Sequence, residues 1–283
     1  LCKAIGRSRR DVVLLLADDL QASSEKPLRE VLGLDADLPE VLAAWPGRGR
    51  AHLIIDALDA ARDAKIAHQL RSAMGAVIAD DTRWRVVASV RRFDLKHSPE
   101  TRDLFPGNPV DGYGDKEFAG TAHFDVPELT EAEISFVAKE NREVRALVAS
   151  ARKYKTTYAL LKQPFNLSLA CELLRAGVSV PEIVPFETNT VLLDRFWDRR
   201  VTDAQPQGAQ REAVLATMVE GLVKRLAMRL KDDRTTDRSI VTELASRYVL
   251  DPAAFADGEI RFSHHLLHDY AVSRLLFRSH NAG

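Results

Sequence analysis

Runs of apolar residues in the first part of the chain predict buried strands that alternate with helices. Three short runs bounded by charged residues cover 11–17, 51–56 and 85–90, and a weaker fourth covers 121–126. Continuous apolar runs, unlike strict alternation, are typical of strands that are buried on both faces. Between the second and third runs, one helix face is marked at spacings of three and four by Ile66, Leu70, Met74 and Val77. The rhythm of strand, helix and strand predicts an α/β domain with a parallel sheet.

After Pro127 the pattern becomes helical. Thr130 and Glu133 have the spacing of a capping box, which satisfies free amides at a helix start. The apolar stripe of the helix that follows consists of Ile134, Val137, Val144 and Leu147. A second helix is expected from Pro164 to Ala176, with Gly177 placed to end it.

The last third of the chain also predicts helices, with one hairpin. Apolar stripes indicate helices around 214–226 and 239–249. Asp257-Gly258 between apolar flanks is a hairpin signal, and Ser263 is placed to cap a last helix over 264–277. This order is consistent with a winged-helix domain. We therefore expect an α/β domain over 1–126, a small helical domain over 127–188 and a winged-helix domain over 189–283.

Composition narrows the class of protein. The 283 residues suggest about two compact units. Lys and Arg number 40 against 41 Asp and Glu, so the bulk charge makes nucleic acid an unfavoured partner, although a local basic patch stays open. Two cysteines exclude a disulfide framework and a four-cysteine zinc site, and they fit a reducing cytoplasm. The six-residue apolar run near the start is far short of the ~20 residues of a membrane span.

The stretch from His52 to Asp59 carries the first candidate chemistry. Asp56 ends an apolar strand and Asp59 follows three positions later. Open α/β sheets bind ligands at the carboxyl ends of their strands, where a carboxylate can hold Mg²⁺ against nucleotide phosphates. The alternative is that Asp59 caps the next helix. Arg91 follows the third strand at the same edge, where it could read a phosphate or be a surface cation.

Histidines near the end of the chain form a second candidate. His264 and His268 have the spacing of the zinc-protease helix motif and share one helix face, but His265 stands where that motif has its general base. A metal site therefore competes with two other interpretations, a phosphate-reading histidine at a helix start and plain packing.

Together these segments resemble the signal-transducing ATPases with numerous domains (STAND), in their bacterial NACHT-like branch. The resemblance covers nearly the whole chain and depends on the order of five short motifs, each of low specificity by itself. They are the Walker B strand (LIIDALD, 53–59), sensor 1 (ASVR, 88–91), the proline motif of the helical domain (QPFNLSL, 163–169), the entry to the winged helix (LLDRFW, 192–197) and its closing helix (FSHHLLHDY, 262–270).

The resemblance implies a role for each matching residue. Asp56 would be the Mg²⁺-associated Walker B acid, and Asp59 the second acid of that motif. Arg91 would lie near the γ-phosphate. Pro164 would pack against the adenine, and His264 would contact the β-phosphate of bound ADP and so lock a closed state.

Two departures from the family pattern bear on activity. Many relatives have a further acid where this chain has Ala60, which fits weak hydrolysis. No G-x-x-x-x-G-K-[ST] phosphate loop occurs in the sequence, and Gly47-Arg-Gly-Arg50 lacks its Lys and hydroxyl. We therefore expect a fragment that begins after this loop and is inactive as an ATPase. Without the central phosphate-loop strand, two neighbouring strands would have unpaired backbone groups, so we also expect low stability and weak nucleotide binding.

The leading hypothesis is an ATP/ADP-controlled switch for signalling or phage defence. ADP would hold its closed state and ATP would favour self-oligomerisation, with an effector domain upstream and a sensor downstream. The alternative is a non-catalytic module that binds protein or nucleic acid through a basic face. A simpler interpretation of that face is a solvated surface whose cations pair with Asp194, Asp198 and Glu220. A metallohydrolase at 264–268 is a third hypothesis. The residues of the basic face are Arg195, Arg199, Arg200, Lys224, Arg225 and Arg229.

Overall fold

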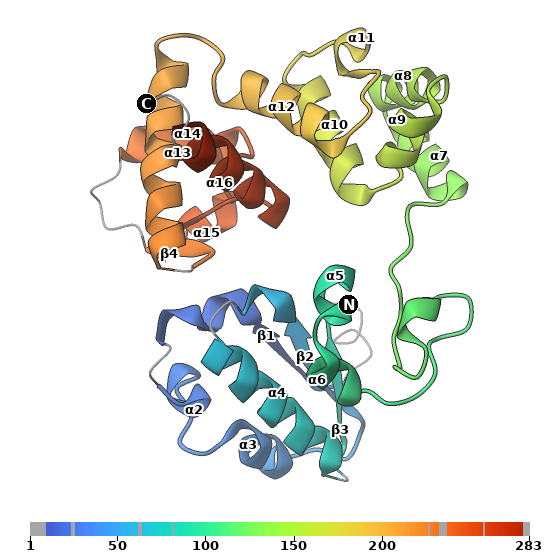
Figure 1. Ribbon diagram of the computed structural model, residues 1–283, viewed down its shortest axis with the longest axis vertical. Helices are drawn as coiled ribbons and strands as arrows, with labels where there is room; N and C mark the ends of the chain where they lie inside the picture. The colour runs from blue at the N-terminus through green and yellow to red at the C-terminus, as the bar shows by residue number, and fades with distance from the viewer. Residues whose placement is uncertain are drawn as a thin grey trace. The chain divides into compact units, whose positions relative to one another are not determined.

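A computed structural model describes residues 10–23, 26–61, 64–80, 82–225, 227–231, 237–256 and 258–279. The chain forms two compact units, Leu1–Val126 and Pro127–Gly283 (Figure 1). Among these described residues, no helix has both the length and the apolar character needed to cross a membrane.

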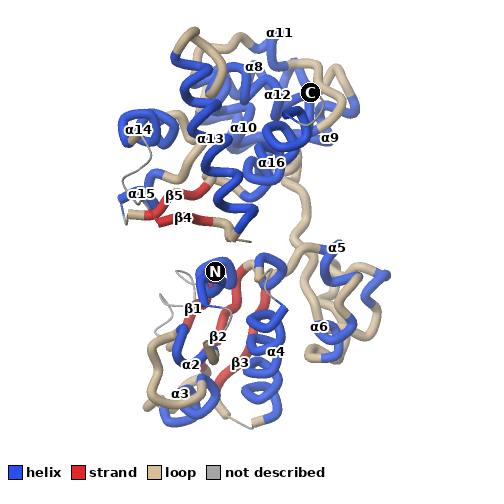
Figure 2. Tube along the Cα trace, turned by 60° about the vertical axis from the view of Figure 1, so that its left-hand side comes forward, coloured by secondary structure: helices blue, strands red, loops and turns tan. Residues whose placement is uncertain are grey.

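The first unit is built on a parallel sheet, as the apolar runs predict. Its strands are β1 (Val12–Leu16), β2 (Ala51–Asp56) and β3 (Trp84–Ala88), in the order β1-β2-β3 (Figure 2). Helix α4 (Ala64–Ala79) packs against β3, and α2 (Leu28–Val31) and α3 (Leu38–Ala44) contact α4. The weak run at 121–126 is not a strand; its one ladder contact is a bridge between Thr121 and Pro106.

The register of the sheet shows which strand has neighbours on both sides. Ile54 of β2 lies between Leu14 of β1 and Val87 of β3, and the β2–β3 pairing continues over five positions. Strand β2 therefore has a hydrogen-bonded neighbour on both sides. Among the described residues, β1 and β3 are the edge strands of this sheet and each pairs on one side only, so the expectation of unpaired backbone groups beside a missing strand stays a prediction.

Short elements complete the first unit around an apolar core. Trp84 is 2% exposed, and its indole Nε1 donates to the carbonyl of Leu42 at 2.7 Å. This contact fixes the start of β3 against the end of α3. The short elements are η1 (Ala17–Ser23), η2 (Leu58–Ala60), α5 (Arg92–Lys96), α6 (Pro99–Asp103) and η3 (Lys116–Phe118).

The second unit is helical, with one small sheet. The capping box is confirmed, because Thr130 and Glu133 exchange hydrogen bonds at the start of α7. One apolar cluster runs from Ile134 to Ala271 and continues across the expected boundary at 188/189. The helices are α7 (Glu131–Glu140), α8 (Arg142–Ala151), α9 (Lys155–Leu161), α10 (Pro164–Arg175), α11 (Val180–Ile183), α12 (Asn189–Arg200), α13 (Gln207–Lys224), α14 (Arg238–Ser246), α15 (Pro252–Ala256) and α16 (His265–Ser279).

The small sheet differs from the expected hairpin. Strand β4 (Arg229–Lys231) pairs antiparallel with β5 (Glu259–Arg261). Asp257 of the expected turn lies outside the described residues, but the residues before it form α15 rather than a strand. Pro252 suits the first turn of a helix, and the Asp251 carboxylate accepts from the Ala253 amide at 2.9 Å. The segment that was expected to form the first strand of the hairpin is therefore a helix.

Candidate functional site

Side chains from β2 and β3 meet at the carboxyl edge of the sheet. Asp56, the last residue of β2, is exposed. The Ser89 hydroxyl donates to its Oδ1 at 2.5 Å and accepts from the Ala57 amide at 2.7 Å. Ala57 has a left-handed backbone (φ 52°), which turns the chain at the strand end. The expected edge position of Asp56 is confirmed, and Ser89 joins it.

Asp59 and Arg91 form a clamp at the same edge. The Arg91 Nε lies 3.0 Å from Asp59 Oδ2, and the Arg91 backbone amide donates to Asp59 Oδ1 at 3.1 Å. The Asp59 side chain is 6% exposed, whereas that of Arg91 is 41% exposed. Both carboxylate oxygens of Asp59 thus face Arg91, which fits a positioning role and not the capping of the next helix. Arg92, the next residue, does not join this clamp and pairs with Asp115 at 2.7 Å.

Two acids after β1 extend this edge. Asp18 and Asp19 lie in the first turn of η1, directly after β1. Because Leu16 is in register with Asp56, all three strands end at the same edge. Reasoning from the sequence did not single out these two acids or assign Ser89 a partner. The sequence did contain a signal that could have found them, because each strand of the sheet ends in a polar residue or is followed by one within two positions.

In the second unit, the structure brings the proline motif and the histidines together. Pro164 is exposed at the start of α10, and the next ring, Phe165, stacks on His264 with centroids 4.1 Å apart. His264 in turn lies 4.1 Å from the ring of His265. The starts of α10 and α16 are therefore neighbours, joined by this stack of three rings.

His264, and not Ser263, caps the last helix. His264 Nδ1 accepts from the Leu266 amide at 3.1 Å, so a neutral ring has its proton on Nε2. The Ser263 hydroxyl donates instead to the Tyr248 carbonyl at 2.6 Å. The expected cap at Ser263 is therefore wrong, and an imidazole takes that place.

The histidine pair does not form a metal centre. His268 is 1% exposed in the core, with Nδ1 3.0 Å from Asp269 Oδ1 and its ring edge-on to Phe262. In the part of the chain that the structure describes, no group of three or more His, Cys, Asp or Glu could hold a metal ion. The packing interpretation fits His268, and the metallohydrolase hypothesis has no support.

Four of the six residues of the basic face expected in the last third make internal contacts, whereas Lys224 and Arg225 are exposed. Arg199 donates to the Ala176 carbonyl, Arg200 pairs with Glu172 at 3.0 Å, and Arg229 pairs with Glu259 at 2.7 Å. Arg195 donates to the carbonyl of Ile183. The expected pairing of this face with Asp194 and Asp198 is wrong, because both carboxylates pair with Arg274, and the described residues give Glu220 no ion pair.

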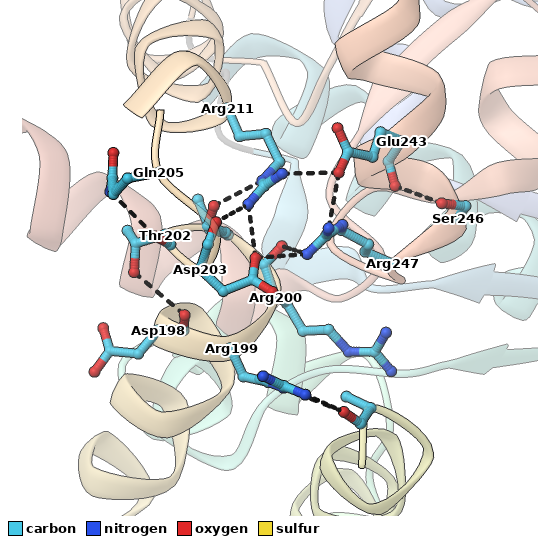
Figure 3. Close-up of polar contacts among 12 residues, drawn as sticks. Asp198, Arg199, Arg200, Thr202, Asp203, Gln205, Arg211, Glu243, Ser246 and Arg247 are labelled. Atoms are coloured by element: carbon cyan, nitrogen blue, oxygen red, sulfur yellow. Dashed lines mark hydrogen bonds and ion pairs between the residues drawn. The ribbon is translucent and has the colours of Figure 1, made fainter. Parts of the chain in front are cut away.

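A buried arginine organises the segment between α12 and α13. Arg211 of α13 is 1% exposed and donates to the Val201 carbonyl, to Asp203 and to Glu243, each through a different nitrogen (Figure 3). Arg247, the residue directly after α14, bridges the same two carboxylates. No pattern in the sequence marked Arg211 as buried. Its partners lie 8 to 32 residues away, so the network joins α13, α14 and the loop before α13.

No protein-family model matches the chain, and no curated protein does so either.

Proposed function

We propose that the chain is the nucleotide-responding core of an ATP/ADP-controlled switch of the STAND class. The observation that carries the proposal is the exposed Asp56 carboxylate, held by the Ser89 hydroxyl at the carboxyl end of the central strand. Ligands of open parallel sheets bind at this edge. A P-loop-type sheet, the winged-helix arrangement, oligomerisation in the ATP state and a signalling or defence role are parts of the same proposal.

The chemistry at the sheet edge suits a magnesium nucleotide. Mg²⁺ prefers carboxylate and hydroxyl oxygens and keeps several waters, so the exposed Asp56 could hold it directly or through water. Bound Mg²⁺ would neutralise charge on the phosphates. The buried Asp59 holds the Arg91 guanidinium at this edge, where a phosphate oxygen can accept from it.

The second unit supplies a candidate lock for the diphosphate state. His264 caps the 15-residue α16, and Pro164 begins the 12-residue α10. Amides at helix starts favour phosphate groups. We infer that His264 contacts ADP and that Pro164 packs against its base. Such a lock requires ADP to favour one conformation over the other energetically.

Hydrolysis is not the expected activity of this chain. Its sequence holds no phosphate-loop motif, and Ala60 stands where many relatives have an acid. We therefore propose weak, Mg²⁺-dependent nucleotide binding without measurable turnover.

Isothermal titration of the chain with ADP and ATP, with and without Mg²⁺, tests the proposal. Asp56→Asn is expected to remove most of the Mg²⁺-dependent binding, because one neutral amide replaces the carboxylate ligand. Asp80→Asn is the matched control, since Asp80 is an exposed acid after α4, just before β3. Binding that needs no Mg²⁺ and survives Asp56→Asn would contradict the proposed site.

The lock has its own test. His264→Ala should weaken ADP binding more than ATP binding, and equal losses would count against the lock. His264→Asn is the control for helix α16, because Asn is a good N-cap residue but lacks the imidazole. If the imidazole is the lock, His264→Asn loses ADP preference while α16 keeps its protection from hydrogen exchange.

A further inference from the structure

Arginines that the proposed nucleotide site does not use gather at the amino end of the sheet in the first unit. Arg10 precedes β1, Arg50 precedes β2, and Arg85 of β3 is in register with His52 of β2. Burial lowers the pKa of His52, and the charges of these three arginines lower it further. The His52 Nδ1 is buried and has no hydrogen-bond partner among the described residues. Three arginines thus lie close enough to His52 for their charges to disfavour its protonated form.

Among the described residues, these arginines have no carboxylate partner. The described part of the chain gives no ion pair to Arg10, Arg48, Arg50 or Arg85 (each of them exposed). Among the described residues, the acids next to these strand starts are Asp11, which pairs with Arg83 at 2.7 Å, and the exposed Asp80; Asp81 lies outside the described residues. The amino end of the sheet therefore has a local positive excess in a chain of formal net charge −1.

The loop that presents two of these arginines has a fixed path. The Arg83 guanidinium donates to the Pro46 carbonyl at 2.8 Å and to the Gly49 carbonyl at 3.0 Å. Gly47 has φ +142°, and a Cβ there would lie 2.7 Å from that guanidinium. The loop therefore wraps closely around Arg83 and holds Arg48 and Arg50 outward. A preformed loop loses less conformational entropy when it binds a ligand.

An exposed aromatic ring lies next to this loop. Trp45 ends α3 and is 44% exposed, directly before Pro46. Its ring is edge-on to that of Trp84, with centroids 6.0 Å apart. Trp84 is itself fixed to Leu42 through its indole nitrogen. The Trp45 indole is thus supported along one side and open to solvent elsewhere.

We propose that the amino end of this sheet binds single-stranded nucleic acid. Arg10, Arg48, Arg50 and Arg85 would contact successive phosphates, and Trp45 would stack on an unpaired base. Cationic grooves with exposed aromatic rings are how proteins bind single strands without reading their sequence. A duplex keeps its bases stacked and offers Trp45 nothing to stack on, and an acidic peptide offers it no base. The site lies at the sheet end opposite Asp56 and does not depend on the proposed nucleotide switch.

Fluorescence anisotropy of a labelled 15-nucleotide oligothymidylate, titrated with the full chain at several salt concentrations, tests the phosphate contacts. Three or four contacts predict that log Kobs falls against log[salt] with a slope of about −2 to −3. Arg48→Ala/Arg50→Ala is expected to weaken binding about tenfold at 0.1 M salt. Lys139→Ala/Arg142→Ala removes the same charge from the second unit and should leave the affinity unchanged.

Tryptophan fluorescence tests the stacking contact. Of the three tryptophans, Trp84 is 2% and Trp197 0% exposed, so quenching by the oligonucleotide reports on Trp45. Trp45→Leu keeps apolar contact with Trp84 and should abolish the quenching, with a loss of affinity of about fivefold or more. Circular dichroism confirms that this variant is folded.

Four outcomes would overturn the proposal. They are the absence of salt-dependent binding, an equal loss of affinity in the Lys139→Ala/Arg142→Ala control, equal affinity for a hairpin duplex, and equally effective competition by polyglutamate. Binding with no quenching of Trp45 would overturn the stacking contact.

Discussion

Replacing Arg211 by alanine is expected to destabilise the second unit by about 3–4 kcal/mol. Its side chain is 1% exposed and donates to four groups, the Val201 carbonyl at 2.7 Å, Asp203 Oδ1 at 2.6 Å, Glu243 Oε1 at 2.7 Å and the Asp203 carbonyl. Breaking a buried ion pair by removing one partner costs about 3–5 kcal/mol when the other charge stays buried.

Two features of the network decide where the loss of stability in Arg211→Ala falls within the range of about 3–5 kcal/mol. The Asp203 and Glu243 side chains are 25% and 36% exposed, and both keep Arg247 as a partner, so their charges stay partly compensated. The carbonyl of Val201, a fully buried residue, loses the donor that Arg211 supplied, which costs about 1–3 kcal/mol. The lost packing of the long side chain adds to this. We therefore expect a loss near the lower end.

Native-state hydrogen exchange measures this loss in the second unit alone. Amides of α13 and α14 should exchange about 100- to 1000-fold faster in Arg211→Ala, while amides of β2 in the first unit serve as an internal reference. Arg211→Met keeps most of the packing of the long side chain but removes its charge, so comparing it with Arg211→Ala distinguishes the two contributions to stability. Arg247→Ala, which removes a partly exposed partner, should cost about 1 kcal/mol. A change below ~1 kcal/mol in Arg211→Ala would refute the reasoning that this network holds the unit together.

Three smaller perturbations test other parts of the structure. Thr130→Ala removes the oxygen that caps α7 and should cost about 1 kcal/mol in urea unfolding. The Tyr158 hydroxyl and other partners lower the pKa of Glu131 from 4.5 to about 2, so its stabilising effect is present above pH 4.5 and is lost as the pH falls towards 2. Glu131→Gln should flatten the stability profile in that window, and an unchanged profile would contradict this. Gly47→Ala places a methyl group against the Arg83 guanidinium at a positive φ, and should destabilise the first unit by about 1–3 kcal/mol in hydrogen exchange of β2.

Local signals explain why several elements could be predicted. The apolar runs of β1, β2 and β3, the stripe of α4 and the capping box of α7 each involve residues within one helix or one strand. Local signals gave a wrong prediction where a turn signal and a helix-start signal lay close together. The Asp257-Gly258 turn signal favoured a hairpin, whereas Pro252 and the Asp251 cap began a helix just before it.

The candidate site could be predicted in part for the same reason. Asp56 and Arg91 follow apolar runs, and parallel strands place their carboxyl ends at one edge, so the sequence alone brought these residues together. It could not show that Asp59 is buried against Arg91, or that Ser89 binds Asp56, because those contacts join residues 32 and 33 positions apart. The same limit hid the stack of Phe165 on His264.

The sequence by itself determined that an α/β segment precedes a helical one, where β1, β2, β3 and several of the longer helices lie, and which carboxylates end a strand. These features depend on periodicity and on neighbours within a few residues. Only the tertiary structure decided that β2 pairs directly with β3, that β4 is the partner of β5, and that Arg195, Arg199, Arg200 and Arg229 contact internal carbonyls and carboxylates. The physical reason is that a strand edge or a guanidinium can bind many partners of the same chemistry, and the choice among them is made by the packing of the whole unit.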